Sequence, residues 1–586
     1  MFRHMKSFLA LLMALMMLFT GALAEQPAFT PGSYSASANG MMGEVKVDVV
    51  FADSAIESVT ITEQNETPSI AHAALDKIPS EIVQYQSLAV DTVTGATMTS
   101  NAIIDAVKQC VTLAGGSVDA LMVPVIKEEK AIEAKTLETD VVIVGAGGAG
   151  LSAAISASEQ GASVIVVEKM ATVGGTTALS SGLVQVPGTQ QQADAGIVGD
   201  TWEIYANDIY NRGGQLGNKE IVDTICKNAY GMMEWLAGNG INWNPKIQNK
   251  HGEDVTYLRT IAPIAPEGHS GALGAVLTNT MAAKAQEIGA QIIFNTKAHT
   301  ILMEDGKAVG VVATDSENGI EYTIKASAVI IATGGFAANA EMYNRFNPDF
   351  SVENSDYRAF SGSLGEGVTM AEAAGAALVD MHQAKILTSS GGPATAVANA
   401  IYVNENGERF VDETAAGEVL AAAMIKQAGD HCYMIYDGQT LSETPEKIAE
   451  MVAAGSVVTA DTLAGLAEAM GMEPAALEAS VIGYNKVVAG ETEDEFGRTN
   501  VGSTIEVGPF YAAERHVRLH YTIGGIKIDK DAHVYSTADA IIPGLYAAGE
   551  TTGGVHGNYR VGANALSEVL VMGRIAGATA VAEMAK

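Results

Sequence analysis

Three glycines and an acidic residue occur together in one short stretch, with the spacing of a dinucleotide-binding site. Gly145, Gly147 and Gly150 form a Gly-x-Gly-x-x-Gly turn, and Glu168 follows 18 residues after the last of them. Such glycines allow a tight turn and let backbone N–H groups approach a pyrophosphate at a helix N-terminus. An acid at this distance is placed to accept hydrogen bonds from a ribose diol. The stretch therefore predicts a dinucleotide site.

The segments on either side of this turn have alternating strand and helix patterns. Residues 140–144 are a continuous β-branched run suited to a buried parallel strand, and residues 163–167 repeat that pattern. Between them, residues 151–160 form a helix of small side chains. A strand, a glycine turn, a helix and a second strand make one unit of a parallel sheet. We therefore predict a Rossmann-like α/β domain around the motif.

Three further segments indicate which dinucleotide binds. The first follows Gly174, where Gly175, Thr176 and Thr177 offer backbone and hydroxyl donors. The second, residues 330–335, ends one predicted strand, and the third, residues 543–550, ends another at Glu550. Segments so widely spread along the chain suit FAD, whose flavin lies far from its adenosine. Since the sequence has no second strand-borne Gly-x-Gly-x-x-Gly for a nicotinamide, we predict non-covalently bound FAD, with electrons arriving by another route.

The first part of the chain has the pattern of a separate, small α+β unit, residues 28–116. Residues 43–62 alternate apolar and polar side chains, as in a half-buried antiparallel hairpin, and residues 101–113 have helical spacing. A hydroxyl-rich turn, residues 91–100, lies between them. Residues 117–137 are predicted to be a linker to the larger part.

Composition and charge narrow the classes of function. The 586 residues are enough for several domains, and 48% are apolar, which supports large cores. Only 34 basic residues stand against 68 acidic ones, a formal charge of −34. Such acidity, with no basic tract to offset it, argues against nucleic-acid binding and against charge-driven docking on anionic lipid.

The first 24 residues have the pattern of an export signal. Arg3 and Lys6 precede an apolar run over residues 8–19, and a small-x-small cleavage site ends at Ala24. We therefore expect an extracytoplasmic location, at the cell surface or in a periplasm. The three cysteines are scattered, so they predict neither a disulfide framework nor a metal site.

Several of these motifs resemble the soluble fumarate reductase family of flavoproteins, which includes urocanate reductases, with ketosteroid dehydrogenases in the same broad group. The resemblance runs from about residue 138 to 586. It rests on the Gly145 turn, the Gly174 run, residues 330–335, 365–367, 520–525 and 556–566. It implies an FAD-binding domain of residues 138–380 and 521–586, with an inserted mixed α+β cap domain, residues 381–520, closing over the flavin.

The N-terminal unit resembles the FMN-binding domain that often precedes such reductases. The run from Asp91 through Thr94-Gly-Ala-Thr97 to Thr99 matches the motif on which a flavin transferase attaches FMN through a phosphoester. The resemblance makes Thr99 the acceptor of covalent FMN. Electrons would then pass from FMN to FAD.

The resemblance also implies the reaction and its residues. Reduced FAD would deliver a hydride to an activated carbon–carbon double bond, which needs hydrogen-bond donors aimed at the oxygen where charge develops. His520 and Arg560 match the positions that hold the substrate carboxylate or carbonyl, and Tyr521 could donate a proton. Further cofactor-binding positions in the matched segments are Glu550, Asn564 and Leu566.

The sequence departs from the family at three places. The His-Pro pair of fumarate reductases falls at Leu387-Thr388, their Thr-Glu-x-x-Arg segment falls near residues 392–396, and their proton-donating arginine falls at Gly417. These losses argue against fumarate, and also against urocanate. They favour a substrate with one polar end and a larger or less polar remainder.

Three functions from different classes remain open. The first is an exported ene-reductase that acts on an α,β-unsaturated acid or carbonyl compound and is fed by a membrane-bound electron donor. The alternatives are an FAD-dependent dehydrogenase of the ketosteroid type and an extracytoplasmic flavin electron carrier. A covalent FMN on Thr99 favours the reductase over the dehydrogenase, and His520 with Arg560 argues against a mere carrier.

Overall fold

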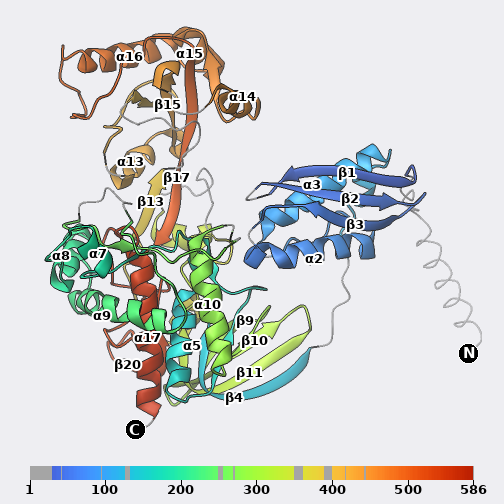
Figure 1. The fold of residues 1–586 in the computed structure, drawn as a ribbon, viewed down its shortest axis with the longest axis vertical. Helices are drawn as coiled ribbons and strands as arrows, with labels where there is room; N and C mark the ends of the chain where they lie inside the picture. The colour runs from blue at the N-terminus through green and yellow to red at the C-terminus, as the bar shows by residue number, and fades with distance from the viewer. Residues whose placement is uncertain are drawn as a thin grey trace, which may run out of the picture.

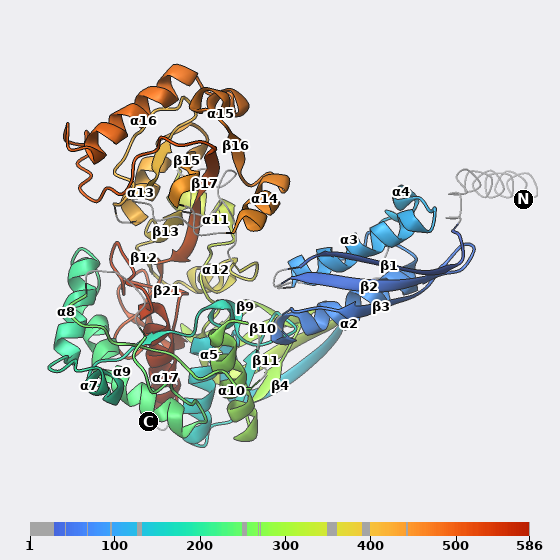
Figure 2. The ribbon, with the colours of Figure 1, turned by 45° about the horizontal axis from the view of Figure 1, so that its top comes forward.

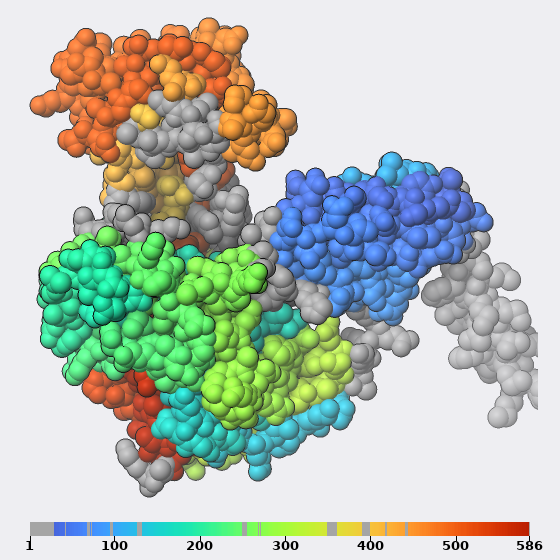
Figure 3. Space-filling model, viewed as in Figure 1, coloured from blue at the N-terminus to red at the C-terminus, as the bar shows by residue number. Residues whose placement is uncertain are grey.

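The computed structural model describes three bodies, and the third is inserted into the chain of the second (Figure 1). The described residues are 29–40, 43–66, 68–93, 96–125, 132–248, 255–267, 269, 271–348, 360–388, 399–415, 417–440 and 444–584. The predicted export signal, residues 1–24, lies outside them. Figure 3 shows the N-terminal body, in blue, as a lobe beside the larger body.

The N-terminal body is a three-stranded antiparallel sheet with helices packed on it. The predicted hairpin is β2 (Glu44–Phe51) and β3 (Ile56–Glu63), and β1 (Gly32–Asn39) adds a third strand beside β2. Alternate residues of β2 are fully buried because every second side chain of a strand faces the same side. Two helices, α2 (Pro68–Tyr85) and α3 (Thr97–Leu113), complete this core.

Two sequence predictions for this region need correction. Helix α3 begins at Thr97 rather than at residue 101, so the last four residues of the predicted turn form its first turn. The predicted linker is also shorter than residues 117–137. Its start forms α4 (Val118–Leu121), whose Leu121 is buried in the N-terminal core, and its end belongs to β4 (Glu133–Val144), which is lengthened by parallel pairing with β11.

The larger body is built on a mainly parallel sheet in the order β19-β20-β11-β4-β5-β8. Its pairs from β20 to β8 are parallel, and β19 closes the other edge antiparallel. The predicted strand–turn–helix–strand unit is therefore present as β4, α5 and β5. The bounds are β5 (Val164–Val167), β8 (Gln291–Ile293), β11 (Ile320–Ile331), β19 (His533–Tyr535) and β20 (Ile541–Ala547), with β9 (Lys297–Glu304) and β10 (Lys307–Asp315) forming an antiparallel meander on β11.

Small residues let two helices of this body, α5 (Gly148–Glu159) and α17 (Asn564–Met584), pack closely against each other. A Cβ on Gly573 or Gly577 of α17 would lie 2.3 or 2.4 Å from a backbone oxygen of α5. Helices α9 (Lys219–Gly238) and α10 (Leu273–Glu287) pack beside them. Helix α17 is long and apolar enough to cross a membrane, but most of it is buried here, as in the core helix of a globular domain.

Residues 384–522 include the third body, which corresponds to the predicted cap (Figure 2). Its sheet has the order β13-β17-β15-β14, with β16 also paired to β17. The bounds are β13 (Ala384–Thr388), β14 (Ile401–Val403), β15 (His431–Asp437), β16 (Val458–Ala460) and β17 (Phe510–Thr522), with helices α13 (Gly417–Met424), α14 (Pro445–Ala453), α15 (Leu463–Met470) and α16 (Pro474–Val488).

A buried ion-pair network holds part of the cap together. Arg409 donates to both carboxylate oxygens of Glu413, at 2.8 and 2.9 Å, and to Asp494 at 2.7 Å. Arg498 donates to Glu413 at 2.7 Å. Because all four side chains are at most 4% exposed, each charge depends on its partners for solvation.

Strand β17 positions the residues of the candidate site. It starts in the cap and ends in the larger body, where β13 runs beside it (Figure 1). At its end it meets the region of the small sheet β12-β18-β21. The remaining elements are α6 (Gly175–Leu179), β6 (Val184–Gln185), α7 (Gln190–Asp194), α8 (Trp202–Arg212), β7 (Thr260–Ile261), α11 (Ala340–Phe346), α12 (Glu366–Ala373), β12 (Leu378–Val379), β18 (Gly525–Lys527) and β21 (Thr552–Gly553).

Candidate active site

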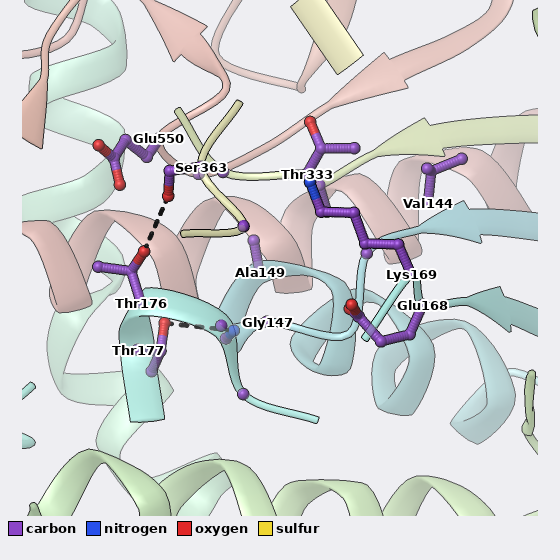
Figure 4. A pocket seen from close by; sticks show the side chains of 18 of the residues that line it. Val144, Gly147, Ala149, Glu168, Lys169, Thr176, Thr177, Thr333, Ser363 and Glu550 are labelled. Carbon is purple, nitrogen blue, oxygen red and sulfur yellow. Dashed lines mark hydrogen bonds between the residues drawn. The ribbon is translucent and has the colours of Figure 1, made fainter. Parts of the chain in front are cut away.

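A cavity lies where β4, β5, β11 and β20 end, and most of the predicted cofactor residues line it (Figure 4). Ligands of open α/β sheets bind at the carboxyl ends of the strands. The predicted residues that line this cavity are Gly145, Gly147, Glu168, Gly175, Thr176, Thr177 and Glu550.

Two glycines of the turn, Gly145 and Gly150, have no room for a side chain. Gly145 has φ +104°, a conformation that favours glycine, and its N–H donates to Val167 at 2.8 Å. A Cβ on Gly150 would lie 1.9 Å from the Gly145 oxygen, so Gly150 closes the turn without lining the cavity. Gly147 is the N-cap of α5 and directs the helix N-terminus at the cavity. This backbone cradle fits the pyrophosphate of a dinucleotide.

Glu168 directly follows β5 and holds the glycine turn in shape. Its carboxylate accepts hydrogen bonds from the N–H groups of Ala146, at 2.7 Å, and Met170, at 2.8 Å. Burial is the main cause that raises its pKa above the usual value. The side chain thus has a structural task in addition to the ribose-binding role expected from the sequence.

Two threonines at the start of α6 link three segments around the cavity. Thr177 Oγ1 accepts from the N–H of Gly148 at 3.3 Å, and Thr176 Oγ1 lies 3.3 Å from Ser363 Oγ (Figure 4). Their hydroxyl groups therefore line the cavity beside the N-terminus of α5 and can donate to a phosphate there.

Glu550 follows β20 and joins the cavity to the end of β17. One of its oxygens accepts from the Thr522 N–H at 3.0 Å. Burial raises its pKa to about 7. Because Thr522 directly follows Tyr521, this contact places the catalytic candidates of β17 beside the cofactor cavity.

Arg560, Tyr521 and Glu568 form a buried group at this end of the site. The Arg560 guanidinium lies 4.8 Å from the centre of the Tyr521 ring, and the Tyr521 hydroxyl donates to Glu568 at 3.2 Å. Burial raises the pKa of Glu568 to about 8 and that of Tyr521 well above its usual value. Both groups therefore hold their protons at neutral pH.

His556 completes this group from the loop before α17. Its Nε2 lies 4.0 Å from Glu568, and burial, together with the charges of Arg560 and Lys385, lowers its pKa to about 3. Asn564 contacts the other ring nitrogen at 3.4 Å and also accepts from the Tyr205 hydroxyl. His556 is thus a neutral imidazole at physiological pH.

The other predicted residues lie differently. His520 is exposed, whereas Tyr521 is buried. A bulge explains this: Lys385 pairs with Tyr521 and Ile386 with Leu519, so His520 is the extra residue between them. Asn564 and Leu566 are buried in the first turn of α17 and do not line the cavity. The structure therefore brings Arg560 to Tyr521, and directs His520 to a different surface.

Sequence reasoning missed two charged residues here, Lys385 and Glu568. Lys385 is 6% exposed, and its Nζ donates to the Tyr559 hydroxyl and to the Arg560 carbonyl, both at 3.0 Å. Glu568 lies on the apolar helix α17. It is one of three charged residues on that helix and lies among apolar neighbours, which was a usable signal because a buried charge needs a partner. Lys385, in a short strand, gave no such signal.

Thr99 is the third residue of α3 and is 3% exposed. Its hydroxyl donates to the carboxylate of Glu66, which is equally buried. Glu66 was not singled out from the sequence. Two residues of the motif, Thr94 and Gly95, lie outside the described part of the chain.

The N-terminal body contacts the larger body close to the cofactor cavity. Val93, inside the flavin-attachment motif, lines a small gap together with Gly175 and Phe360, which also line the cofactor cavity. Lys77 of α2 forms an ion pair with Glu317 of the larger body. The motif and the cavity are therefore neighbours.

The three departures from the family pattern can be placed only in part. Leu387 and Thr388 end β13, and Gly417 begins α13. Residues 392–396 lie outside the described part of the chain.

Comparisons with known proteins agree with this architecture. The family model described as FAD binding domain matches residues 140–566, and that described as FMN-binding domain matches residues 40–112. A urocanate reductase of Eggerthella lenta is 34% identical over 94% of this chain and 92% of its own length. An NADH:acrylate oxidoreductase of Vibrio harveyi is 31% identical over 94% of this chain, which spans 61% of that relative.

A solved structure supports the same assignment. The open conformation of a flavocytochrome c3 fumarate reductase superposes with a TM-score of 0.66 at 30% identity, covering 77% of this chain and 79% of that one. A 3-ketosteroid Δ1-dehydrogenase of Sterolibacterium denitrificans, at 21% identity and a TM-score of 0.65, shares the fold. With an FMN-binding domain ahead of its FAD-binding domain, this chain belongs to the fumarate and urocanate reductase family of flavin-dependent oxidoreductases that act on carbon–carbon double bonds.

Proposed function

We propose that this protein is an exported ene-reductase. Electrons enter at an FMN attached to Thr99 and reach the double bond of an α,β-unsaturated acid or carbonyl compound through non-covalent FAD. The pattern of residues 1–24 supports export, and a flavin transferase and a membrane-bound electron donor are the partners that this proposal requires. The named relatives reduce urocanate, acrylate and fumarate, which supports a small unsaturated substrate.

The surroundings of Thr99 support a covalent FMN there. Thr99 lies in the first turn of α3, where free backbone N–H groups and the helix dipole favour a phosphate. The helix cap, Ala96, makes no side-chain hydrogen bond, so no side chain of the cap competes for these groups. Val93 of the attachment motif lies near Gly175 and Phe360 of the cofactor cavity, and this proximity supports electron transfer between the two flavin sites.

The observation that carries the proposal is a set of unsatisfied buried atoms beside Tyr521. Within the part of the chain that the structure describes, Arg560 Nε, His556 Nε2 and Glu568 Oε1 have no hydrogen-bond partner. Buried polar atoms are normally paired, so a ligand is expected at this place. When bound, reduced FAD supplies the hydride.

The chain's own residues would then polarise and protonate the substrate. Arg560, a fixed cation, can hold the carboxylate or carbonyl oxygen where negative charge develops. His520, which is exposed at the bulge of β17, would contact the substrate only from the solvent side. Tyr521 can donate the proton at the carbon next to that group, with neutral Glu568 behind it to replace the proton. This pair takes the place of the family arginine that is absent at Gly417.

An anaerobic assay with a reduced viologen dye tests the proposal on a panel of unsaturated acids and enones. Arg560→Ala should lower turnover by about 10²–10³, because one preorganised donor is removed. Arg345→Ala is the matched control, since Arg345 is exposed and pairs with Glu372 on the surface.

Two results would overturn the assignment. If Arg560→Ala and His520→Ala both reoxidise the reduced flavins with substrate as fast as the parent, the substrate binds elsewhere. If the parent reoxidises with none of the panel but oxidises a saturated ketone instead, the dehydrogenase alternative holds.

A further inference from the structure

Glu66 and Thr99 form a buried contact between two separate parts of the N-terminal body. Both residues are 3% exposed, and the Thr99 hydroxyl donates to a Glu66 carboxylate oxygen. Glu66 comes just after β3, and Thr99 lies at the start of α3, 33 residues away. A carboxylate is one of the side chains that can remove a proton from a hydroxyl.

The backbone around Glu66 keeps its carboxylate in this position. A Cβ on Gly40, in the connection from β1 to β2, would lie 2.6 Å from Glu66 Oε1. The Glu66 N–H donates to the side chain of Gln64 at 2.7 Å. The absence of a side chain at Gly40 therefore leaves the space that the carboxylate fills, and this space is next to Thr99.

We propose that Glu66 is the proton acceptor in the attachment of FMN to Thr99. This inference rests on the proposed role of Thr99. A threonine hydroxyl is a weak nucleophile at its free pKa and needs an adjacent base. In the step, Thr99 Oγ1 bonds to the FMN phosphorus of an FAD molecule held by the transferase. The bond from that phosphorus to the AMP oxygen breaks, AMP leaves, and the hydroxyl proton passes to Glu66.

The product of this step also fits the contact. The new phosphodiester carries a negative charge beside Glu66, and a second negative charge buried next to it would be costly. A Glu66 that has kept the proton is neutral and can donate a hydrogen bond to a phosphoryl oxygen. One side chain thus accepts from the hydroxyl before the reaction and donates to the phosphate afterwards.

Thr99 must become accessible to the transferase for a short time. Its neighbour Met98 is 54% exposed, so the first turn of α3 already reaches the surface of this body. Local opening of a helix end is a low-energy motion in most proteins. Two roles for Glu66 then predict opposite effects on the rate of FMN attachment. A base speeds attachment, whereas a side chain that only shields Thr99 from the transferase slows it.

The test measures the rate of FMN attachment to the full-length apoprotein with purified flavin transferase and FAD, read as fluorescence of the denatured band on a gel. Glu66→Gln keeps the size and the hydrogen-bond donor of the product state but cannot accept a proton. We expect it to slow attachment by about a hundredfold or more, with full labelling after long incubation. Glu63→Gln, an exposed glutamate at the end of β3, is the matched control and should label at the parent rate.

Gly40→Ala supplies a second, independent variant, because it displaces the Glu66 carboxylate while leaving the charge in the chain. It should also slow attachment, and circular dichroism and the thermal midpoint show whether either variant is folded. Parent-like or faster labelling of folded Glu66→Gln overturns the role of Glu66. Labelling of Thr99→Ala, or none of the parent, instead overturns the proposed role of Thr99.

Discussion

Removal of the Glu168 carboxylate should weaken FAD binding through the glycine turn as well as through the ribose. In the parent, the N–H groups of Ala146 and Met170 lie 2.7 and 2.8 Å from the Glu168 carboxylate oxygens that accept from them. Glu168→Ala removes both acceptors. Ala146 is inside the turn that must approach the pyrophosphate. The mutation therefore acts on the part of the cavity that must be ordered before FAD can bind.

The size of the effect follows from these two contacts. A buried donor left without its acceptor costs about 1–3 kcal/mol, so the two together cost about 2–6 kcal/mol. If FAD binding has to restore the order of the turn, even the lower limit of this cost, about 2 kcal/mol, corresponds to a Kd about thirtyfold higher. Loss of a hydrogen bond to the ribose would add to this.

Titration of FAD into apoprotein, followed by flavin fluorescence, measures the affinity. The Thr99→Ala background removes any signal from covalent FMN. Glu138→Ala is the control, because Glu138 is exposed on the same β4 strand that leads into the turn, and its Kd should not change. A Kd for Glu168→Ala within threefold of the parent would refute the reasoning and separate Glu168 from the cofactor.

Three further predictions concern packing, pH and the cap. Gly150→Ala should abolish FAD retention, because its Cβ would lie 1.9 Å from a backbone oxygen. Gly231→Ala, within α9, has open space for its Cβ and should instead raise the free energy of unfolding, measured by denaturant titration, by about 0.5–1 kcal/mol. The pKa of Glu568 is raised from 4.5 to about 8, so its contribution to stability is fully present below pH 4.5 and is lost as the pH rises to 8, at about 1.4 kcal/mol per pH unit. Thermal melts of Glu568→Gln apoprotein should therefore show a stability that rises relative to the parent between pH 5 and 8. A difference that stays constant over this range would contradict the prediction. Arg409→Ala leaves the two buried carboxylates of Glu413 and Asp494 without this cation, which should destabilise the cap by about 3–5 kcal/mol and make it sensitive to limited proteolysis. Unchanged proteolysis would show that Arg498 alone suffices to hold these carboxylates.

The parts of the fold that were predicted correctly have local causes. The alternation of β2 and β3, the β-branched run that ends β4 and the glycine turn before α5 each follow from side chains within a few residues of one another. Two elements of the N-terminal body were missed for equally local reasons. The serine- and alanine-rich β1 has little apolar alternation, and α2 contains Pro79, which usually argues against a helix interior.

The sequence by itself determined the cofactor class, since Gly145, Gly150 and Glu168 are read from a single stretch of chain. Only the tertiary structure decided which side chains share a site. Tyr521 and Glu568 are 47 residues apart, and Lys385 reaches the Arg560 carbonyl across 175 residues. Their contacts arise because β17, β13 and α17 pack together, and a bulge in β17 turns His520 outward while Tyr521 stays buried. Packing of distant segments depends on the whole core, so no local pattern of spacing encodes it.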